Sequence, residues 1–446
     1  MFEGAPKART WKLSVLAAVL LTGGCRSQPV ATVTEKAPPP AATCAPVSQG
    51  EMPKDPEPPT RPLRRCFEDV PPWVDSAVAL LLDRAGEDLD RNDPDGALAC
   101  AEEAARQAPR SVEAHHDRGV ALIRLGRFEE ARDALALALS IAPNDPETLE
   151  LASDFYVNHL PPSAERAAIG LEYARRGSRY AGKDRERAGH LALLEGQALI
   201  DLGRSVEALR PIGVALKHLP DDSSARYERG VALFELCRFE EARKAFDKVL
   251  EVEPDHAHAI FHLGLIQERL GDENEATARF AEASRRDPKS FPPVPDVSAV
   301  EFSARVRRVT AALPPDVRHD LAGITVDTAE LPSSDDHTAE LPPLSPTILG
   351  LFRGLPLGRD DVPEAATPAT RGGRGPRART SGGASSSGNP ATYATPERAI
   401  VLYRRNILRS VQSAGELDRA IERTLLHEVG HLRGEDDGSL RDRGLE

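Results

Sequence analysis

Small and apolar residues in the middle of the chain recur with a long period that predicts paired helices. A ladder of prolines marks this period, at Pro109, Pro143, Pro220, Pro254 and Pro288. Neighbouring prolines stand 34 residues apart, except that Pro143 and Pro220 are separated by 77 residues. Because proline cannot continue a helix, each is expected to follow the second helix of one structural unit.

Small residues stand at fixed distances before these prolines. A glycine lies 24 residues earlier in four units, at Gly119, Gly196, Gly230 and Gly264, and an alanine lies 12 residues earlier in five, at Ala97, Ala131, Ala208, Ala242 and Ala276. Such side chains let two helices approach closely. A helix-turn-helix period of this length resembles the tetratricopeptide repeat. The resemblance implies an all-α solenoid of about six repeats over residues 72–290, irregular around 159–166.

Stacked repeats of this kind form a superhelix with a concave groove. The expected ligand is a peptide or protein in that groove, and the alternative is a spacer without a specific ligand. Three histidines, His256, His258 and His262, lie at the start of the first helix of one repeat. They are interpreted as partly exposed residues rather than as a second metal site.

Beyond residue 290 the helical period ends and a mixed pattern begins. Residues 302–313 fit an amphipathic helix. β-Prone runs predict strands over residues 321–326, 347–355 and 399–408. Residues 363–396 are rich in Gly, Ser, Thr, Pro and Arg and predict a disordered insertion. The predicted fold class is therefore multidomain, an all-α repeat solenoid followed by a small α/β domain over residues 298–446.

The pattern HExxHxxGxxD runs from His427 to Asp437. Residues four apart share one face of a helix, so His427 and His431 can direct ring nitrogens at one metal ion. A catalytic zinc takes three protein ligands and leaves its fourth position for water. Glu428 is then the candidate general base for that water.

The residues around this motif predict where its helix begins and ends. Ser413 and Glu416 form an S-x-x-E capping box at its start. Gly434 can end the helix just after the second histidine. The acids at 435–437 follow at once, where the chain can fold back towards the metal. The methionines of the sequence are Met1 and Met52, so no Met-turn follows the motif.

Three segments of the C-terminal region resemble a family of small bacterial zincin-like metallopeptidases. They are LGLFRGLPL at 349–357, IVLYRR at 400–405 and TLLHEVGH at 424–431. That family is known for a compact α/β domain of the minimal zincin type with an HExxHxxGxx(D/E) motif. The resemblance implies that His427, His431 and Asp437 are zinc ligands and that Glu428 is the general base. Asp436 is the alternative third ligand, because a turn could present either acid.

The N-terminus has the pattern of a targeting segment. A basic start precedes a short apolar run that ends in Leu-Thr-Gly-Gly-Cys at Cys25. This resembles a bacterial lipobox and implies a lipoprotein signal peptide over 1–25 with lipidation of Cys25. The alternatives are an ordinary signal peptide and an uncleaved anchor. Residues 26–71 are Pro-rich and predict a disordered tether. The predicted location is the bacterial cell envelope, lipid-anchored to a membrane on its periplasmic or cell-surface face.

The placement of the cysteines and the net charge further limit the possible disulfides and partners. In an oxidising compartment Cys44 and Cys66 could pair within the tether, whereas Cys100 and Cys237 are interpreted as buried small hydrophobic residues. The formal charge of −13 argues against nucleic acid as the main partner.

Together these features predict a membrane-anchored zinc metallopeptidase that hydrolyses peptide bonds and whose solenoid binds a protein or peptide. Arg404 or Arg405 is a candidate to steady an oxyanion or a substrate carboxylate. One alternative is a non-catalytic scaffold in which the C-terminal domain is a structural or degenerate metal module. Another is an assembly factor for an envelope complex. The sequence predicts no oligomeric state.

Overall fold

The computed structural model describes residues 77–339, 341–358 and 398–445. The expected signal peptide with Cys25, the tether with Cys44 and Cys66, and the insertion at 363–396 lie outside the described residues. The described chain falls into two compact units that meet in sequence between Asp221 and Asp222. Among the described helices, none combines the length and apolarity that a bilayer crossing requires.

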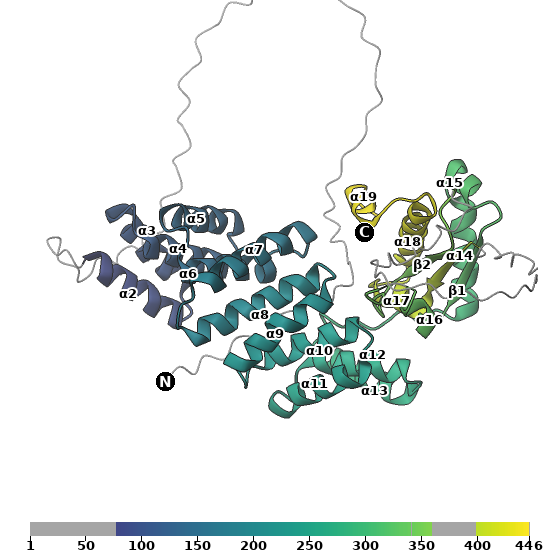
Figure 1. The fold of residues 1–446 in the computed structure, drawn as a ribbon, viewed down its shortest axis with the longest axis horizontal. Coiled ribbons are helices and arrows are strands. Elements are labelled where there is room, and N and C mark those ends of the chain that lie inside the picture. Colours follow the sequence, from purple (N-terminus) through teal and green to yellow (C-terminus); the bar gives the residue numbers. More distant parts are fainter. Residues whose placement is uncertain (1–76, 340, 359–397, 446) are drawn as a thin grey trace, which may run out of the picture. The chain divides into compact units, whose positions relative to one another are not determined.

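The first unit consists of antiparallel helix pairs (Figure 1). Its helices are α2 (Ala77–Asp90), α3 (Pro94–Gln107), α4 (Val112–Arg124), α5 (Phe128–Ile141), α6 (Pro146–Asp154), α7 (Ala164–Tyr180), α8 (Arg185–Asp201) and α9 (Ser205–His218). Aspartates begin several of them: the Asp145 carboxylate accepts a hydrogen bond from the Thr148 amide at 2.9 Å, and Pro146 occupies the first turn. Both choices suit a helix N-terminus, which has unpaired N–H groups.

The third helix pair is irregular, as the spacing of the prolines indicates. After α6 the chain continues into a π-helical segment, η1 (Phe155–His159), before α7 begins. Phe155 is fully buried, and its ring meets that of Tyr156 edge-on with centroids 5.2 Å apart. The wider turn thus places a bulky aromatic side chain in the core of the first unit.

The recurrent glycines mark the closest approach between the two helices of a pair. Each faces a large side chain sixteen residues later: Gly119 faces Leu135, Gly196 faces Ile212, Gly230 faces Phe246 and Gly264 faces Phe280. A methyl group at Gly230 would lie 2.5 Å from the Phe246 ring. The glycine is therefore required by the packing of the helix pair and not by backbone conformation.

The second unit begins with two further helix pairs. They are α10 (Ser223–Glu235) with α11 (Phe239–Val252), and α12 (Ala257–Arg269) with α13 (Glu273–Arg286). Among the described loops inside the pairs, glycine takes positive φ at Gly126, Gly203 and Gly271, and Asn92 does so between α2 and α3. Cys237 takes the same conformation between α10 and α11, with φ of 56°. Cys237 is free and half-buried, whereas Cys100 is buried, as expected, but takes part in a disulfide.

The histidines of α12 differ from the expectation of partial exposure. His258 and His262 are buried, and His262 stacks on Phe246 at 5.0 Å while its Nδ1 lies 3.3 Å from the Tyr227 hydroxyl. Neighbouring helices bury these rings. The sequence of a single repeat does not show which of its residues the next helices will cover. Burial lowers the pKa of His262 to about 4, so its ring is neutral at physiological pH.

The C-terminal part of the second unit is a three-stranded sheet with helices, which confirms the predicted α/β class. Its elements are α14 (Ala299–Ala312), α15 (Pro315–Asp320), β1 (Thr325–Ala329), α16 (Ser334–His337), β2 (Gly350–Arg353), β3 (Ala399–Tyr403), α17 (Arg404–Arg409), α18 (Leu417–Leu432) and α19 (Asp437–Asp442). The strand order is β1-β3-β2, with β1 parallel and β2 antiparallel to β3. Helix α18 packs on β2, β3 and α14 around one apolar core (Figure 1).

Two strand predictions need correction. The strand expected at 321–326 is β1, which begins at Thr325 after a turn. The strand expected at 399–408 ends at Tyr403, and residues 404–409 are helical. The ladder has no partner beyond this point, because Tyr403 pairs with the last residue of β1 and Leu402 with the first of β2. The apolar residues after it fill the core equally well from a helix.

Candidate metal centre

Helix α18 carries both histidines of the motif one turn apart. Its buried face is formed by Leu417, Ile421, Leu425, Val429 and Leu432. Apolar residues at this spacing fix the helix against the sheet and leave His427 and His431 half-buried on another face.

The predicted capping box at the start of α18 is absent. Glu416 is the N-cap residue, but it has helical backbone angles and makes no side-chain capping bond. Its carboxylate instead accepts a hydrogen bond from the Gln412 amide at 3.0 Å, and its own amide donates to the Ser413 carbonyl at 3.1 Å. A turn of backbone bonds therefore begins the helix, so the S-x-x-E pattern does not form the reciprocal pair here.

A glycine turn and a short helix return the chain to the histidines. Gly434 has φ of 86°, and the Glu435 amide donates to the Gly430 carbonyl at 2.9 Å. Helix α19 then begins at Asp437, with Asp436 as its N-cap: the Asp436 carboxylate accepts from the Ser439 amide at 2.8 Å. Asp436 is thereby occupied, and Asp437 is the acid that faces the histidines.

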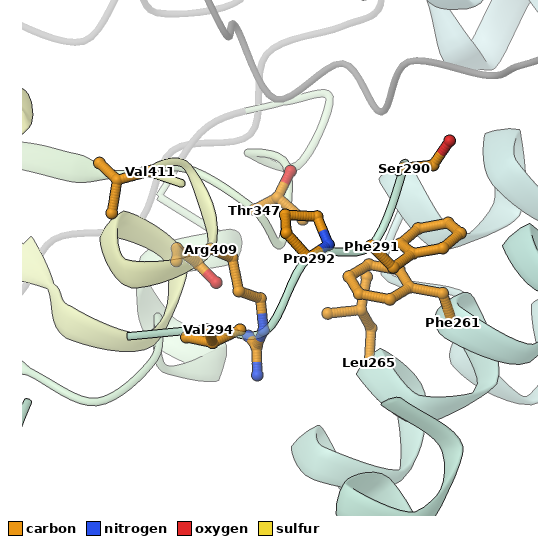
Figure 2. Close-up of a pocket in the computed structure, with 10 residues that line it drawn as sticks. Phe261, Leu265, Ser290, Phe291, Pro292, Val294, Thr347, Arg409 and Val411 are labelled. Carbon is orange, nitrogen blue, oxygen red and sulfur yellow. The ribbon is translucent and has the colours of Figure 1, made fainter. Parts of the chain in front are cut away.

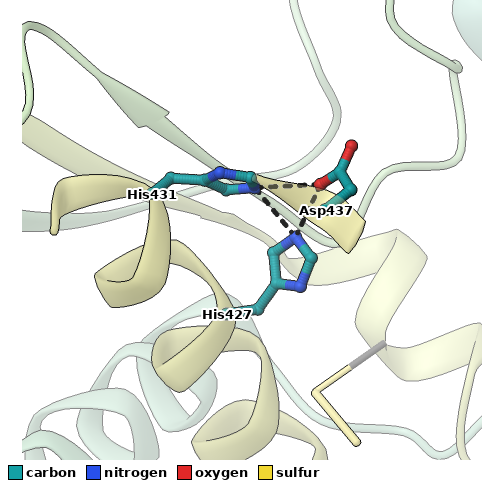
Figure 3. Close-up of side chains that lie close together, drawn as sticks. All are labelled: His427, His431 and Asp437. Carbon is teal, nitrogen blue, oxygen red and sulfur yellow. Dashed lines mark hydrogen bonds and ion pairs between the residues drawn. The ribbon is translucent and has the colours of Figure 1, made fainter. Parts of the chain in front are cut away.

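Figure 3 shows the three side chains converging. Nε2 of His427 and Nε2 of His431 are 3.1 Å apart, and Oδ1 of Asp437 lies 3.7 Å from the first and 3.2 Å from the second. A tetrahedral zinc with ligands at about 2.0–2.2 Å needs ligand atoms about 3.3–3.5 Å apart. The spacing and the His-His-Asp donor set therefore fit such an ion.

Backbone carbonyls hold the opposite side of each imidazole. Nδ1 of His427 lies 2.8 Å from the Leu445 carbonyl oxygen, and Nδ1 of His431 lies 3.1 Å from that of Glu435. A carbonyl can only accept, so each Nδ1 donates its proton, and Nε2 is the ring nitrogen that each histidine directs at the other two side chains of the group. Outer partners of this kind commonly set the tautomer of metal-binding histidines.

Close packing joins α19 to α18. A methyl group at Gly430 would lie 2.2 Å from Cδ2 of Leu440, which is fully buried. Arg443 also donates to both carboxylate oxygens of Glu435 at 2.6 Å. These contacts fix the segment that supplies Asp437 and the Glu435 carbonyl.

Glu428 lies beneath β2. Only 5 % of it is exposed, and its Oε2 accepts a hydrogen bond from the Phe352 amide at 2.7 Å. Burial raises the pKa of Glu428 to about 7, an effect that the nearby His431 and the Phe352 amide oppose. A carboxyl with a pKa near neutrality is suited to taking up and giving back a proton.

The charges of the ligand group support one another. The bond to Asp437 raises the pKa of His431, and the same bond lowers the pKa of the Asp437 carboxyl. Asp437 is thus ionised at neutral pH and supplies the negative charge that a divalent cation favours.

The two arginines proposed for an oxyanion are occupied elsewhere. Arg404 pairs with Glu330 at 2.6 Å, and Arg405 pairs with Glu268, Glu273 and Glu330 at 2.7–3.0 Å. The strand predicted at 399–408 includes both arginines, whereas in the structure they begin α17 just after β3 and their guanidinium groups are taken up by these ion pairs.

Several groups at this centre escape sequence reasoning. The Leu445 and Glu435 carbonyls and the Phe352 amide are backbone groups, which no residue type marks. Leu440 carries only the weak signal of an apolar residue in a polar C-terminal segment.

Comparison with protein families supports the two-part architecture. The zincin-like metallopeptidase family matches residues 380–445, and tetratricopeptide repeat families match residues 82–146, 223–256 and 258–290. The chain thus carries tetratricopeptide repeats followed by a zincin-like domain that contains the His-His-Asp group. No curated protein matches the sequence.

Solved structures resemble the repeats. PilF of Pseudomonas aeruginosa is 16% identical with a TM-score of 0.42, over 48% of this chain and 94% of that one. PilW, a type IV pilus biogenesis factor, is 20% identical with a TM-score of 0.44, over 48% and 96%. YrrB, a repeat protein with an unusual peptide-binding site, is 21% identical with a TM-score of 0.34, over 42% and 93%.

Proposed function

We propose that this protein is a zinc-dependent peptidase whose tetratricopeptide repeats bind a peptide or protein. The observation that carries the proposal is the convergence of His427, His431 and Asp437, with both Nε2 atoms and a carboxylate oxygen at mutual distances of 3.1–3.7 Å. The buried Glu428 beside them supplies an acid–base group. The zincin-like family match agrees with this chemistry.

Each residue has a defined task in this proposal. Zinc, when bound, polarises a peptide carbonyl and lowers the pKa of a bound water to about 7. His427, His431 and Asp437 would hold the ion through two Nε2 atoms and a carboxylate oxygen. Glu428 removes a proton from the attacking water and passes it to the leaving amine. The Leu445 and Glu435 carbonyls keep the two imidazoles in the tautomer that presents Nε2.

Metal content of the purified full chain tests the first part of the proposal. We expect about one zinc per chain by mass spectrometry and its loss in His431→Ala. His319→Ala is the matched control, because His319 is exposed in α15. A folded, unmutated protein without stoichiometric metal after exposure to zinc would overturn the proposal.

A structural zincin module is the second candidate, and one contact favours it. The Glu428 carboxylate is buried and bonded to the Phe352 amide, as a carboxylate that merely ties β2 to α18 would be. In that case the repeats supply the function, as a scaffold or an assembly factor. The two candidates are distinguished by Glu428→Gln. If the unmutated protein hydrolyses peptides and this variant retains zinc but does not, the protein is an enzyme.

We also propose that Cys25 is lipidated and that the protein is anchored to a membrane of the cell envelope. The lipobox-like sequence before Cys25 motivates this step. Metabolic labelling with a fatty acid is expected to mark the full chain and to fail for Cys25→Ser, while Cys44→Ser keeps the label. Equal labelling of both variants would contradict it.

Binding by the repeats is open to a direct test. In-cell cross-linking of the full chain is expected to recover a recurrent protein partner joined to the first helices of the repeats, which line the groove in such arrays. Links scattered without a recurrent partner would favour a spacer.

A further inference from the structure

The segment that leads into β2 is held from several sides. We call residues 344–348 the strap. Three of its carbonyl oxygens accept hydrogen bonds from the last repeats and from α17: Leu344 from Cys237 at 3.7 Å, Pro346 from Arg269 and from Asn406 at 3.0 Å, and Ile348 from Asn406 at 2.8 Å. The strap itself turns, because the Ile348 amide donates to the Ser345 carbonyl at 3.3 Å, so these outside donors hold a turn and not an extended strand.

Two of these donors belong to the last repeats. Arg269 is the final residue of α12, and Cys237 lies in the loop between α10 and α11. Cys237 occupies a left-handed backbone position that glycine fills in three comparable loops and Asn92 in a fourth, and this conformation is unfavourable for a residue with a Cβ. Its Sγ contact with the strap is a local gain that glycine could not provide.

The third donor belongs to α17, which is itself fixed to the repeats. Glu268 of α12 is buried, and its carboxylate accepts hydrogen bonds from Arg405 at 3.0 Å and from Arg409 at 2.5 Å. A buried carboxylate shared by two guanidinium groups resists displacement, because removal of either partner leaves charge unpaired. The repeats, α17 and the strap therefore form one connected joint.

Apolar packing does not close this joint completely. A pocket lies beside it, with Phe261, Leu265 and Phe291 on the repeat side and Arg409 on the other (Figure 2); Thr347 and Asn406 also line it. Side chains on opposite walls of a pocket do not touch, so they gain no van der Waals attraction from each other. Beside the pocket, the polar contacts of the strap and the Arg409 guanidinium, 4.7 Å from the centroid of the Phe280 ring, join the two sides.

The strap continues without interruption to the candidate site. Leu349 accepts a hydrogen bond from the Tyr403 amide at 2.9 Å, and Gly350 begins β2. Two residues later the Phe352 amide donates to Glu428. A Cβ at Gly350 would lie 2.9 Å from Oε1 of Glu428, so β2 rests directly on this carboxylate.

We propose that Arg269 is a positioning residue: it holds the strap, and the strap holds β2 over Glu428. In this proposal the last tetratricopeptide repeat helps to position the strand that covers Glu428, in addition to any binding of partners. The consequence for catalysis rests on the proposed peptidase function, whereas the mechanical link from Arg269 to β2 does not.

The test is hydrogen exchange of the full chain, followed by mass spectrometry of peptides that cover β2. We expect Arg269→Met to speed exchange in 350–353 by about tenfold or more, since it removes a charged donor to Pro346. Arg269→Lys should restore part of the protection. Arg243→Met is the control, because Arg243 pairs only within α11. Exchange in α4 and α5 reports that each variant is folded.

Unchanged exchange in β2 of a folded Arg269→Met protein would overturn the proposal. If that variant does not fold, Glu268→Gln gives the same test, because it weakens the hold on Arg405 and Arg409 while keeping the shape of the side chain. If the protein hydrolyses peptides, we expect kcat to fall in Arg269→Met with zinc content unchanged. If Arg269→Met speeds exchange in β2 but the unmutated protein hydrolyses no peptide, the link from Arg269 to β2 is supported and the proposed peptidase function is contradicted.

Discussion

The Phe352 amide donates a 2.7 Å hydrogen bond to the buried carboxylate of Glu428. This bond joins the antiparallel edge strand of the sheet to the helix that carries both histidines. The bond holds the carboxylate of the candidate base against β2. A displacement of β2 is therefore expected to move Glu428, and a displacement of Glu428 to move β2.

Glu428→Gln is expected to keep the fold and the zinc while peptide hydrolysis falls by a factor of about 10²–10⁴. An amide oxygen can still accept the Phe352 hydrogen bond, but it cannot take a proton from water. Zinc content and hydrolysis of a peptide mixture are measured on the same sample. Glu422→Gln is the control, because Glu422 is an exposed residue of the same helix. Full activity in Glu428→Gln would remove Glu428 from the mechanism.

Gly350→Ala should displace β2 from the centre. The added methyl would lie 2.8 Å from Thr424 and 2.9 Å from Glu428. Overpacking of this kind costs about 1–3 kcal/mol of unfolding free energy. We expect a lower melting temperature and loss of activity, whereas Gly415→Ala meets no atom closer than 3.7 Å and should change little.

Leu440→Ala should weaken zinc binding without touching a ligand. The side chain fills the space over Gly430 and keeps α19, with Asp437, against α18. We expect zinc affinity to fall by about 10–100-fold in a competition assay with a chelator, as for other supporting residues of metal sites. Leu270→Ala is the control, since Leu270 is 54% exposed. Equal affinity in both variants would show that α19 needs no such support.

Gly230→Ala and Gly213→Ala should change stability in opposite directions, although both lie in helices of the repeats. The first adds a methyl 2.5 Å from the Phe246 ring, and the second adds one in open space. We expect a loss of about 1–3 kcal/mol for Gly230→Ala and a gain of up to about 1 kcal/mol for Gly213→Ala. Thermal unfolding followed by circular dichroism measures both; a gain for Gly230→Ala would disprove the close approach.

Acid should destabilise the repeats through His262. The unfolded ring takes up a proton near pH 6.5, but the buried ring, whose pKa is about 4, does not. Stability is therefore complete above pH 6.5 and falls as the pH drops towards 4, by about 3 kcal/mol at most. His262→Gln should flatten this dependence of the melting temperature between pH 7 and 5. His319→Gln, at an exposed position, should leave it unchanged.

The sequence by itself determined the periodic and local features. The 34-residue spacing predicted the helix pairs, because each helix-turn-helix unit packs on the next through the same positions. The HExxH pattern placed two imidazoles on one face of α18, and Gly434 ended that helix through its positive φ. These features depend on residues that lie close together in the chain.

Only the tertiary structure decided the rest. It placed Asp437 next to the two histidines while Asp436 caps α19, and it ended β3 at Tyr403, where α17 begins. It also brought the Leu445 carbonyl to His427. Backbone groups occur at every residue and leave no mark in the sequence, so contacts between distant segments that use them become visible only when the chain is folded.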